Sequence, residues 1–193
     1  MTMLSDREIR NSLKCGEIEI TGWYPEPFIG PSSVDLHLDN KAMILDKRKF
    51  AIGEPMHFAE KEKSADKFTE YNGWNEITIH PGEFYILSSV EKLKFADDIV
   101  GFIQGRSSVA RMGINVHAAG FFDCGFEGTA TLEVTNFTSQ PVIIPKYTRI
   151  CQMTFARTGL PAEIPYGMKK DSKYQNQSGP TITKISNDYK NEN

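Results

Sequence analysis

The 193-residue sequence has few cysteines and lacks the motifs of protein-held zinc. Cys15, Cys124 and Cys151 are odd in number and widely spaced, and no CxxC pair occurs, which favours free thiols in a reducing compartment. The signature of zinc-dependent hydrolytic deaminases, H-x-E followed by P-C-x-x-C, is absent. The four histidines do not lie at helical metal-ligand spacings. The sequence therefore predicts no zinc site.

Long apolar runs and an excess of positive charge are also missing. No stretch approaches the roughly 20 consecutive apolar residues of a membrane span, and the first ten residues lack the apolar core of a signal peptide. The formal net charge of −3 argues against non-specific binding to nucleic acid, which needs a basic surface. We therefore expect a cytoplasmic protein that binds neither membranes nor nucleic acid, in which an anionic ligand must find positive charge locally.

The apolar residues follow the two-residue period of β-strands. Val34, Leu36 and Leu38 share one face of a strand, and residues 77–87 and 142–150 each form a strand, a turn and a second strand. Hydrophobic residues make up 39% and charged residues 24%, as in ordinary globular domains. Many short strands with close turns predict a mainly β, barrel or jelly-roll-like fold.

One short helix is predicted near the N-terminus, at residues 6–15. Ser5 and Glu8 form a capping box, in which the serine side chain accepts from the amide of Glu8 and the carboxylate reaches back. Gly16 supplies the left-handed residue that ends a helix. The pattern is typical of an amphipathic surface helix.

Two segments depart from the strand pattern. Residues 46–75 contain a charged run and few regular apolar positions, so we interpret them as a variable surface excursion of a β domain spanning residues 1–160. Residues 161–193 are polar and lack periodicity, so they bury too little surface to order themselves. This segment is either a frayed tail or a flexible arm that closes over a ligand.

The central part of the chain concentrates the reactive groups. Residues 105–113 predict a turn into a short helix ended by a glycine, with Ser107 or Ser108 as N-cap. A helix N-terminus attracts phosphate, and Arg106 and Arg111 add guanidinium groups suited to phosphate oxygens. A capped surface helix with solvated arginines is an equal alternative.

The strand predicted at residues 128–136 carries one carboxylate in its middle. Thr131, Glu133 and Thr135 share the face opposite the apolar residues. Such a glutamate is usually a solvated surface residue, but in a cleft burial would raise its pKa towards that of a general acid/base. Asp123 is the second carboxylate of this region.

Ordered motifs along the chain resemble those of the dCTP deaminase family, which is homologous to the trimeric dUTPases. In the central stretch they are GRSSxARxG at 105–113, G-F-x-D-x-G-F-x-G at 120–128 and T-L-E at 131–133. Elsewhere they are GPSSVDLHL at 30–38, HPGEFYIL at 80–87 and PYGxxxxSKYQNQxGP at 165–180. The likeness covers nearly the whole chain apart from about residues 40–75.

The resemblance implies a distorted jelly-roll, dUTPase-like β-barrel that forms a homotrimer with active sites between subunits. It also implies hydrolytic deamination of dCTP to dUTP and ammonia, a step in the supply of dUMP and dTTP. Mg²⁺ would serve only the triphosphate, no metal would be bound by the protein, and dTTP would act as a feedback inhibitor.

The resemblance also assigns the catalytic groups by position. Glu133 matches the carboxylate that takes a proton from the attacking water and delivers protons to the cytosine ring and the leaving amine. Ser107 and Arg111 match the residues that position the water and stabilise the tetrahedral intermediate. Arg106 and Ser108 match phosphate ligands.

The remaining assignments concern substrate binding. Asp123 matches the aspartate that accepts from the 3′-hydroxyl of deoxyribose, and Thr131 and Gln152 match positions that read the nucleoside and base. The C-terminal ligands of the triphosphate correspond to Tyr166, Lys173 and Gln177. These residues place the arm over the nucleotide.

The family has two branches that differ in their product, and the sequence leaves open to which branch this chain belongs. One branch only deaminates, whereas the other also cleaves dUTP to dUMP and diphosphate in the same site. Residues 119–126 and the tail are more similar to the bifunctional branch. The loop 117–123 is one residue shorter than in either branch, and Ala118 stands in place of a threonine. A dUTP diphosphatase without deaminase activity is therefore a third reading.

Overall fold

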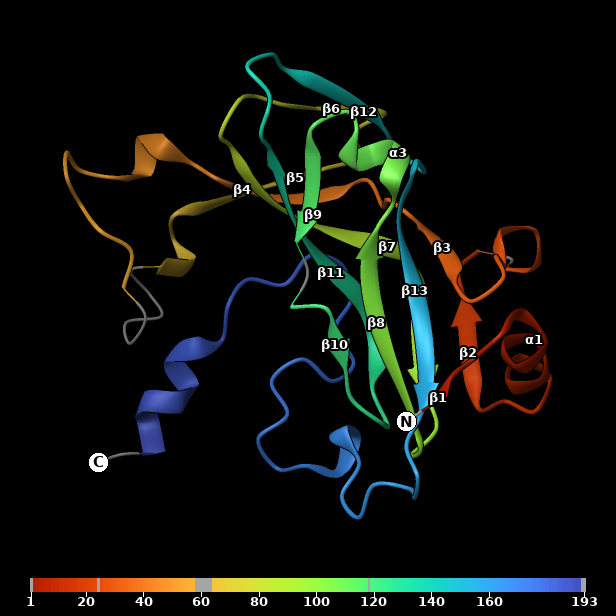
Figure 1. Ribbon diagram of the computed structural model, residues 1–193. Coiled ribbons are helices and arrows are strands. Elements are labelled where there is room, and N and C mark those ends of the chain that lie inside the picture. The colour runs from red at the N-terminus through yellow and green to blue at the C-terminus, as the bar shows by residue number, and fades with distance from the viewer. Residues whose placement is uncertain (1, 24, 58–63, 118, 192–193) are drawn as a thin grey trace.

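The structure is a computed structural model, described here for residues 2–23, 25–57, 64–117 and 119–191. Its regular structure is mostly β, which confirms the predicted class (Figure 1). The strands are β1 Thr2–Met3, β2 Ile18–Thr21, β3 Val34–His37, β4 Lys41–Leu45, β5 Phe68–Asn72, β6 Glu76–Ile79, β7 Phe84–Phe95, β8 Ile99–Gly105, β9 Ile114–His117, β10 Phe121–Phe122, β11 Glu127–Asn136, β12 Val142–Pro145 and β13 Arg149–Arg157. Helices are α1 Asp6–Lys14 and α3 Ser107–Ala110, with 3₁₀ turns η1 Glu26–Phe28, η2 Lys47–Lys49, η3 Tyr166–Met168 and η4 Ile185–Asn191.

The strands form two main sheets that share one core. The first has the order β1-β13-β8-β10, with β3 also paired to β13, and the second has the order β5-β4-β7-β11-β9, with β2 paired to β7. Leu36 and Phe155 of the first sheet and Leu87 and Leu132 of the second are all fully buried in this core. Within the described residues the sheets stay open, so the fold is jelly-roll-like without a closed barrel.

Helix α1 forms as its sequence predicts. The backbone amide of Ser5 donates to Glu8 Oε2 (2.8 Å), and the amide of Glu8 donates to Ser5 Oγ (3.5 Å). Gly16 follows the helix with φ 73°, which a residue without Cβ adopts at little cost. Ile9 is fully buried against the body, so the helix anchors one edge of the molecule.

The surface excursion predicted for residues 46–75 contains a strand that the sequence analysis did not find. Strand β5 pairs with β4 in antiparallel register, from Leu45 opposite Phe68 to Lys41 opposite Asn72. Phe68 is only 7% exposed. The segment has a weak apolar pattern because β5 is short and its later residues face solvent. Pairing with β4 orders the strand.

The C-terminal arm, residues 161–191, packs along the body below β10 and β11 (Figure 1). Its backbone hydrogen-bonds to β11, since the amide of Thr129 donates to Gln177 O (3.0 Å) and the amide of Asn176 donates to Glu127 O (2.7 Å). These contacts are between residues about 50 positions apart, which a local sequence pattern does not reveal. Among the described residues, no helix has the length and apolarity needed to cross a membrane.

Candidate active site

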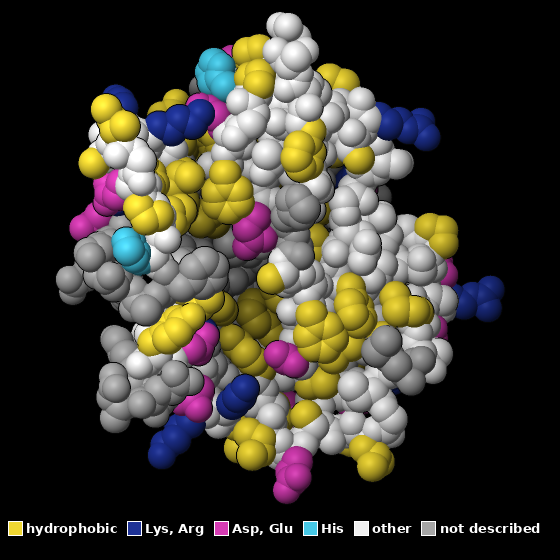
Figure 2. Space-filling model, turned by 60° about the vertical axis from the view of Figure 1, so that its left-hand side comes forward, with side chains coloured by type: hydrophobic (Ala, Val, Ile, Leu, Met, Phe, Trp, Pro, Cys, Tyr) yellow, Lys and Arg dark blue, Asp and Glu magenta, His cyan; other side chains and the backbone are white. Residues whose placement is uncertain are grey.

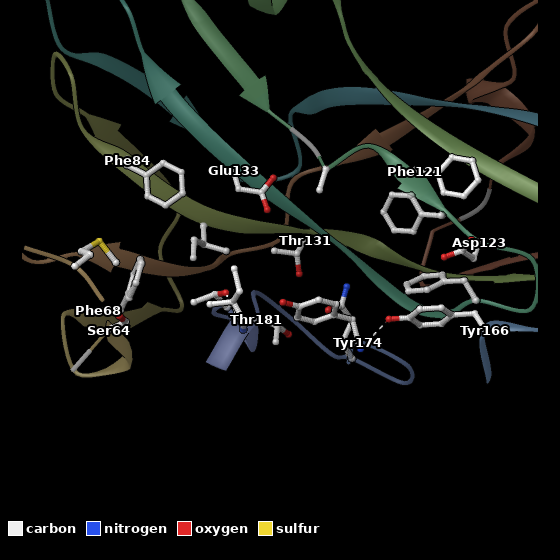
Figure 3. Close-up of a pocket in the computed structure, with 18 of the residues that line it drawn as sticks. Ser64, Phe68, Phe84, Phe121, Asp123, Thr131, Glu133, Tyr166, Tyr174 and Thr181 are labelled. Atoms are coloured by element: carbon white, nitrogen blue, oxygen red, sulfur yellow. Dashed lines mark hydrogen bonds between the residues drawn. The ribbon is translucent and has the colours of Figure 1, made fainter. Parts of the chain in front are cut away.

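A cavity of about 630 Å³ lies between the outer face of β7 and β11 and the C-terminal arm (Figure 3). This volume falls within the range of small-molecule sites, roughly 300–1,000 Å³. The two strands contribute Phe84, Ile86, Thr131 and Glu133 to its lining. On the side of the molecule shown in Figure 2, hydrophobic side chains gather around a hollow with acidic side chains among them. The cavity is the candidate active site.

Glu133 stands in the middle of the cavity floor. Along β11, Leu132 and Val134 are fully buried in the core, so Thr131 and Glu133 face the opposite side, as the two-residue period predicts. Glu133 is flanked by β9 on one side and by Ile86 of β7, its register partner, on the other. A carboxylate held by a central strand in a partly apolar cavity is well placed for proton transfer.

Two buried polar atoms of the wall are without a hydrogen-bond partner among the described residues. They are Thr131 Oγ1 and Gln177 Oε1, both of residues that line the cavity. The side-chain amide of Gln177 is held at its nitrogen, because Nε2 donates to Thr129 O (2.7 Å). Buried polar atoms are nearly always hydrogen-bonded, so the pair fits a ligand that presents both donors and acceptors.

Asp123 and Tyr166 lie together at one end of the cavity (Figure 3). The arm is fixed there, since the amide of Tyr166 donates to Cys124 O (2.8 Å) and the hydroxyl of Tyr166 accepts from the amide of Tyr174 (3.0 Å). Asp123 itself is exposed and has its carboxylate available to a ligand hydroxyl. The structure thus brings Asp123, Thr131, Glu133, Tyr166 and Gln177 to one cavity.

The short central helix begins differently from the prediction. Arg106, with φ −85° and ψ 135°, is the N-cap and makes no side-chain cap hydrogen bond, so the expectation that Ser107 or Ser108 caps the helix is wrong. Strand β8 continues in extended conformation to this point, and both serines therefore occupy the first two helical positions. Helix α3 has four residues and presents both hydroxyls to solvent.

Arg106 is held by an ion-pair network. Its Nε lies 3.2 Å from Asp35 Oδ1, and its Nη1 donates to Arg149 O (2.8 Å). Arg149 Nη1 lies 3.2 Å from the other oxygen of Asp35. Beyond this network, the remaining polar side chains of α3 are exposed. We call the following set the α3 face: Arg106, Ser107, Ser108 and Arg111.

The α3 face is separate from the cavity. Of the described residues that line the cavity, none belongs to the α3 face. Helix α3 leads into β9, which runs antiparallel to β11 with Ile114 opposite Asn136. Asn136 is three residues, or about 10 Å, along the strand from Glu133, and the helix stands beyond Asn136.

Two further predicted residues also lie outside the cavity lining. Gln152 on β13 is opposite Asp35 of β3, and its side-chain oxygen accepts from the hydroxyl of Ser33 (3.4 Å). Lys173 of the arm forms an ion pair with Asp188 (2.5 Å). Gln152 is thus near the α3 face, whereas Lys173 lies in a polar part of the arm.

The cavity also contains residues that the sequence analysis did not select. Met56 and Phe68 come from the segment interpreted as an excursion, and Tyr174 and Thr181 come from the arm. Tyr174 lies within the quoted tail motif, which was the available signal, whereas Met56 and Phe68 carried none. Ala118, which the resemblance places in the nucleoside-reading loop, is outside the described residues.

Comparison with protein families gives one match that spans most of the chain. The profile of the family described as dCTP deaminase-like matches residues 3–158. Among curated proteins, "dCTP deaminase, dUMP-forming" of Methanosphaera stadtmanae is 38% identical over 98% of this chain and 96% of its own. The protein of the same name from Dictyoglomus thermophilum is 39% identical over 97% and 96%, and the "dCTP deaminase" of Thermomicrobium roseum is 37% identical over 95% and 93%.

Solved structures share the fold at lower identity. The 2′-deoxycytidine 5′-triphosphate deaminase of Agrobacterium tumefaciens aligns with a TM-score of 0.62 at 22% identity, over 81% of this chain and 48% of that one. This chain therefore spans about half the length of that protein. A dUTPase from phage phi11 of Staphylococcus aureus aligns with a TM-score of 0.50 at 10% identity, over 75% of this chain and 93% of that one. At these identities, both comparisons show similarity of fold alone.

Proposed function

The chain belongs to the dCTP deaminase-like family, and from this premise we propose that it hydrolyses dCTP to dUMP, ammonia and diphosphate. The expectation that dUTP is the released product gives way to the bifunctional alternative, because several relatives are named dUMP-forming. The observation that carries the proposal is a cavity with Glu133 on its floor and Asp123 at its end. Two carboxylates serve two hydrolytic steps.

Glu133 performs the deamination. Its carboxylate takes a proton from water, the water oxygen adds to C4 of cytosine, and the proton passes to N3. Glu133 then moves the proton of the new C4 hydroxyl to the amine, the C4–N bond breaks as the C4 carbonyl forms, and ammonia leaves. Support comes from the position of Glu133 between two neighbouring strands, which fixes its carboxylate relative to a bound base. Thr131 Oγ1 and Gln177 Oε1 offer polar atoms for that base.

Asp123 serves the second step. Its carboxylate accepts from the 3′-hydroxyl of deoxyribose and orients the water that attacks the α-phosphorus, which releases diphosphate from the dUTP formed in the same site. The exposure of Asp123 at the cavity end, away from Glu133, supports this division of labour (Figure 3). Mg²⁺ enters with the triphosphate and is held through phosphate oxygens, as is usual for this ion.

The triphosphate is bound by the α3 face of a second subunit. Arg106 and Ser108 bind the phosphates, and Arg106 supplies a positive charge that no Lys or Arg supplies among the described residues of the cavity wall. Ser107 and Arg111 position the attacking water and stabilise the tetrahedral intermediate. A homotrimer with sites between subunits would bring the α3 face of one copy to the cavity of another. The separation of these groups on a single chain supports this assembly. The arm closes over the nucleotide with Tyr166, Lys173 and Gln177.

Product analysis tests the proposal. The protein is incubated with Mg²⁺ and either dCTP or dUTP, and nucleotides, ammonia and diphosphate are quantified. We expect dCTP to give dUMP with one ammonia and one diphosphate each, with little free dUTP. Asp123→Asn should instead accumulate dUTP from dCTP. Cleavage of dUTP with dCTP untouched would establish a dUTP diphosphatase alone, and dUTP as the end product would establish a monofunctional deaminase. Addition of dTTP to the same assay measures feedback inhibition.

A further inference from the structure

Strand β7 carries a buried hydroxyl group beside the floor of the cavity. Ser88 is 0% exposed, and its Oγ has no hydrogen-bond partner among the described residues. Ile86, two residues earlier, lines the cavity, and residues two apart share one face of a strand, so Ser88 faces the same side. Thr131 is the register partner of Ser88 on β11. The two side chains are therefore neighbours on this face of the sheet.

Both hydroxyl groups of these neighbours are unpaired, and we call Ser88 and Thr131 the hydroxyl pair. Thr131 Oγ1 is buried and, like Ser88 Oγ, lacks a hydrogen-bond partner within the described part of the chain. The Cβ atoms of cross-strand partners are about 5 Å apart, so rotation of the side chains can bring two hydroxyl groups within hydrogen-bond distance. A buried polar atom without a partner destabilises a protein, and an alanine at position 88 would not incur this cost. The serine therefore fits a requirement of function better than a requirement of the fold.

The next residue along β7 shows the contrast with a structural serine. Ser89 is also 0% exposed, but its Oγ donates to Glu91 O (2.7 Å) and accepts from the amide of Ala130 (2.9 Å). Its hydroxyl thereby ties β7 to β11 where the register of the two strands shifts. The hydroxyl of Ser88 makes no such contact with the residues that the structure describes.

The position of the hydroxyl pair indicates which atom of a bound base it meets. Figure 3 shows Thr131 on the side of Glu133 that is nearer to Tyr166. In the proposed function the sugar lies at that end, because Asp123 accepts from its 3′-hydroxyl there. When N3 of a pyrimidine faces Glu133, the next polar atom towards the sugar is the carbonyl oxygen O2. The hydroxyl of Thr131 is therefore placed to donate to O2.

We propose that the hydroxyl of Thr131 donates to O2 of the base, and that Ser88 is the positioning residue for this contact. The hydroxyl of Ser88 donates to Thr131 Oγ1 and so turns the proton of Thr131 towards O2. The inference rests on the proposed function and assigns a further residue to its first step.

The chemistry of the first step explains what a donor at O2 does. When water adds to C4, the electron pair of the C4–N3 π bond moves to N3. Because N3 is conjugated with the C2 carbonyl, negative charge develops on O2 as well until the proton from Glu133 reaches N3. A hydrogen bond to O2 stabilises this charge. Cleavage at the α-phosphorus places no charge on O2, so the hydroxyl pair accelerates deamination alone.

Ser88→Ala tests the role through measurements that should diverge. The variant removes an unpaired buried hydroxyl, so its melting temperature should be equal to or above that of wild type. The kcat for ammonia release from dCTP should fall about tenfold, whereas diphosphate release from added dUTP should stay within about twofold of wild type. Ser89→Ala is the matched control, because it breaks two hydrogen bonds and should lower the melting temperature without changing the ratio of the two rates.

Substitutions of Thr131 keep the test independent of one variant. Thr131→Val keeps the shape of the side chain and removes the donor, so kcat for deamination should fall by about tenfold or more. Thr131→Ser restores the hydroxyl and should recover most of the rate. Adding Ser88→Ala to Thr131→Val should cause no further loss, because Ser88 acts through Thr131.

Two outcomes would overturn this inference and leave the proposed function intact. One is an equal loss of ammonia release and diphosphate release in Ser88→Ala, which would assign Ser88 a structural role. The other is a wild-type ratio of the two rates in both Ser88→Ala and Thr131→Val. A wild-type protein that converts neither dCTP nor dUTP would instead overturn the proposed function, and this inference with it.

Discussion

The cavity floor and the α3 face hold different reactive groups in opposite settings. On the floor, Glu133 is fixed by strands on both sides and shares its surface with apolar residues. On the α3 face, Ser107 and Ser108 of a four-residue helix and Arg111, its C-cap, stand exposed. A recessed carboxylate is suited to proton transfer, whereas exposed cations bind phosphate weakly until a partner excludes water. The difference supports the proposed assembly, in which one copy of the chain provides half of a site.

The largest expected effect is the loss of deaminase activity when Glu133, on the cavity floor, is replaced. Glu133→Gln keeps the size of the side chain and loses its ability to carry a proton, so deamination of dCTP should fall about 1,000-fold. Hydrolysis of added dUTP should remain within tenfold of wild type, because we propose that Asp123 serves that step.

A matched control lies on the same strand. Glu127→Gln alters a carboxylate that pairs with Lys92 and does not line the cavity, and it should retain wild-type rates. Ammonia release and diphosphate release are measured separately for both variants. Wild-type deamination by Glu133→Gln would remove this residue from the mechanism.

A substitution on the α3 face should lower kcat by less than the substitution of Glu133 does. Arg111→Ala removes a cation that stabilises charge in the transition state, so kcat should fall about 100-fold. Because Arg111 is exposed, its loss should leave the melting temperature of the subunit unchanged. Arg7→Ala, at an exposed position on α1, is the control. A large drop in thermal stability with little change in kcat would assign Arg111 a structural role.

The contact between arm and floor should be sensitive to one glycine. Gly128 has φ 150°, and a Cβ there would lie 3.0 Å from Gln177 O. Gly128→Ala should therefore loosen the arm, raise KM about tenfold with a smaller change in kcat, and speed tryptic cleavage near Lys169. Gly159→Ala, where a Cβ meets nothing within 4 Å, should change neither measurement. Equal KM values for the two variants would separate the arm from substrate binding.

The smallest effect is expected away from both regions. The Ser12 hydroxyl and Arg157 hold the pKa of Glu17 below its usual value. A lowered pKa in the folded state stabilises the protein above the unfolded pKa of about 4.3, and this contribution is lost as pH falls through the folded value. Glu17→Gln should lower the melting temperature slightly at pH 7 and not at pH 3, with activity unaffected. A difference that grows on acidification would reverse the assigned sign.

Local patterns in the sequence predict the elements more fully than the site. The capping box of α1 and the alternation around Glu133 are set by neighbouring residues, and both form as predicted. Strand β5 depends on its pairing with β4, and the arm depends on hydrogen bonds between Gln177 and Thr129, so neither has a local signal. Such long-range contacts decide the shape of the cavity.

The largest difference concerns the central stretch itself. Arg106 and Glu133 are close in sequence and belong to one set of motifs, which the resemblance places in active sites between subunits. Within one chain, β9 leads from α3 and pairs antiparallel with β11, so that the helix stands beyond Asn136, three residues along the strand from Glu133, and does not line the cavity. Sequence proximity therefore leaves open whether the predicted catalytic groups meet within one subunit.

Complementation between two inactive variants tests the composite site most directly. Glu133→Gln and Arg111→Ala subunits are co-expressed with different affinity tags, purified through both tags and assayed with dCTP. If each site joins the floor of one subunit to the α3 face of another, every trimer that carries both tags has two copies of one variant and one of the other, so one of its three sites is fully wild type. The account predicts deaminase activity near that fraction of the wild-type rate. Activity no higher than that of the separately purified variants would contradict it.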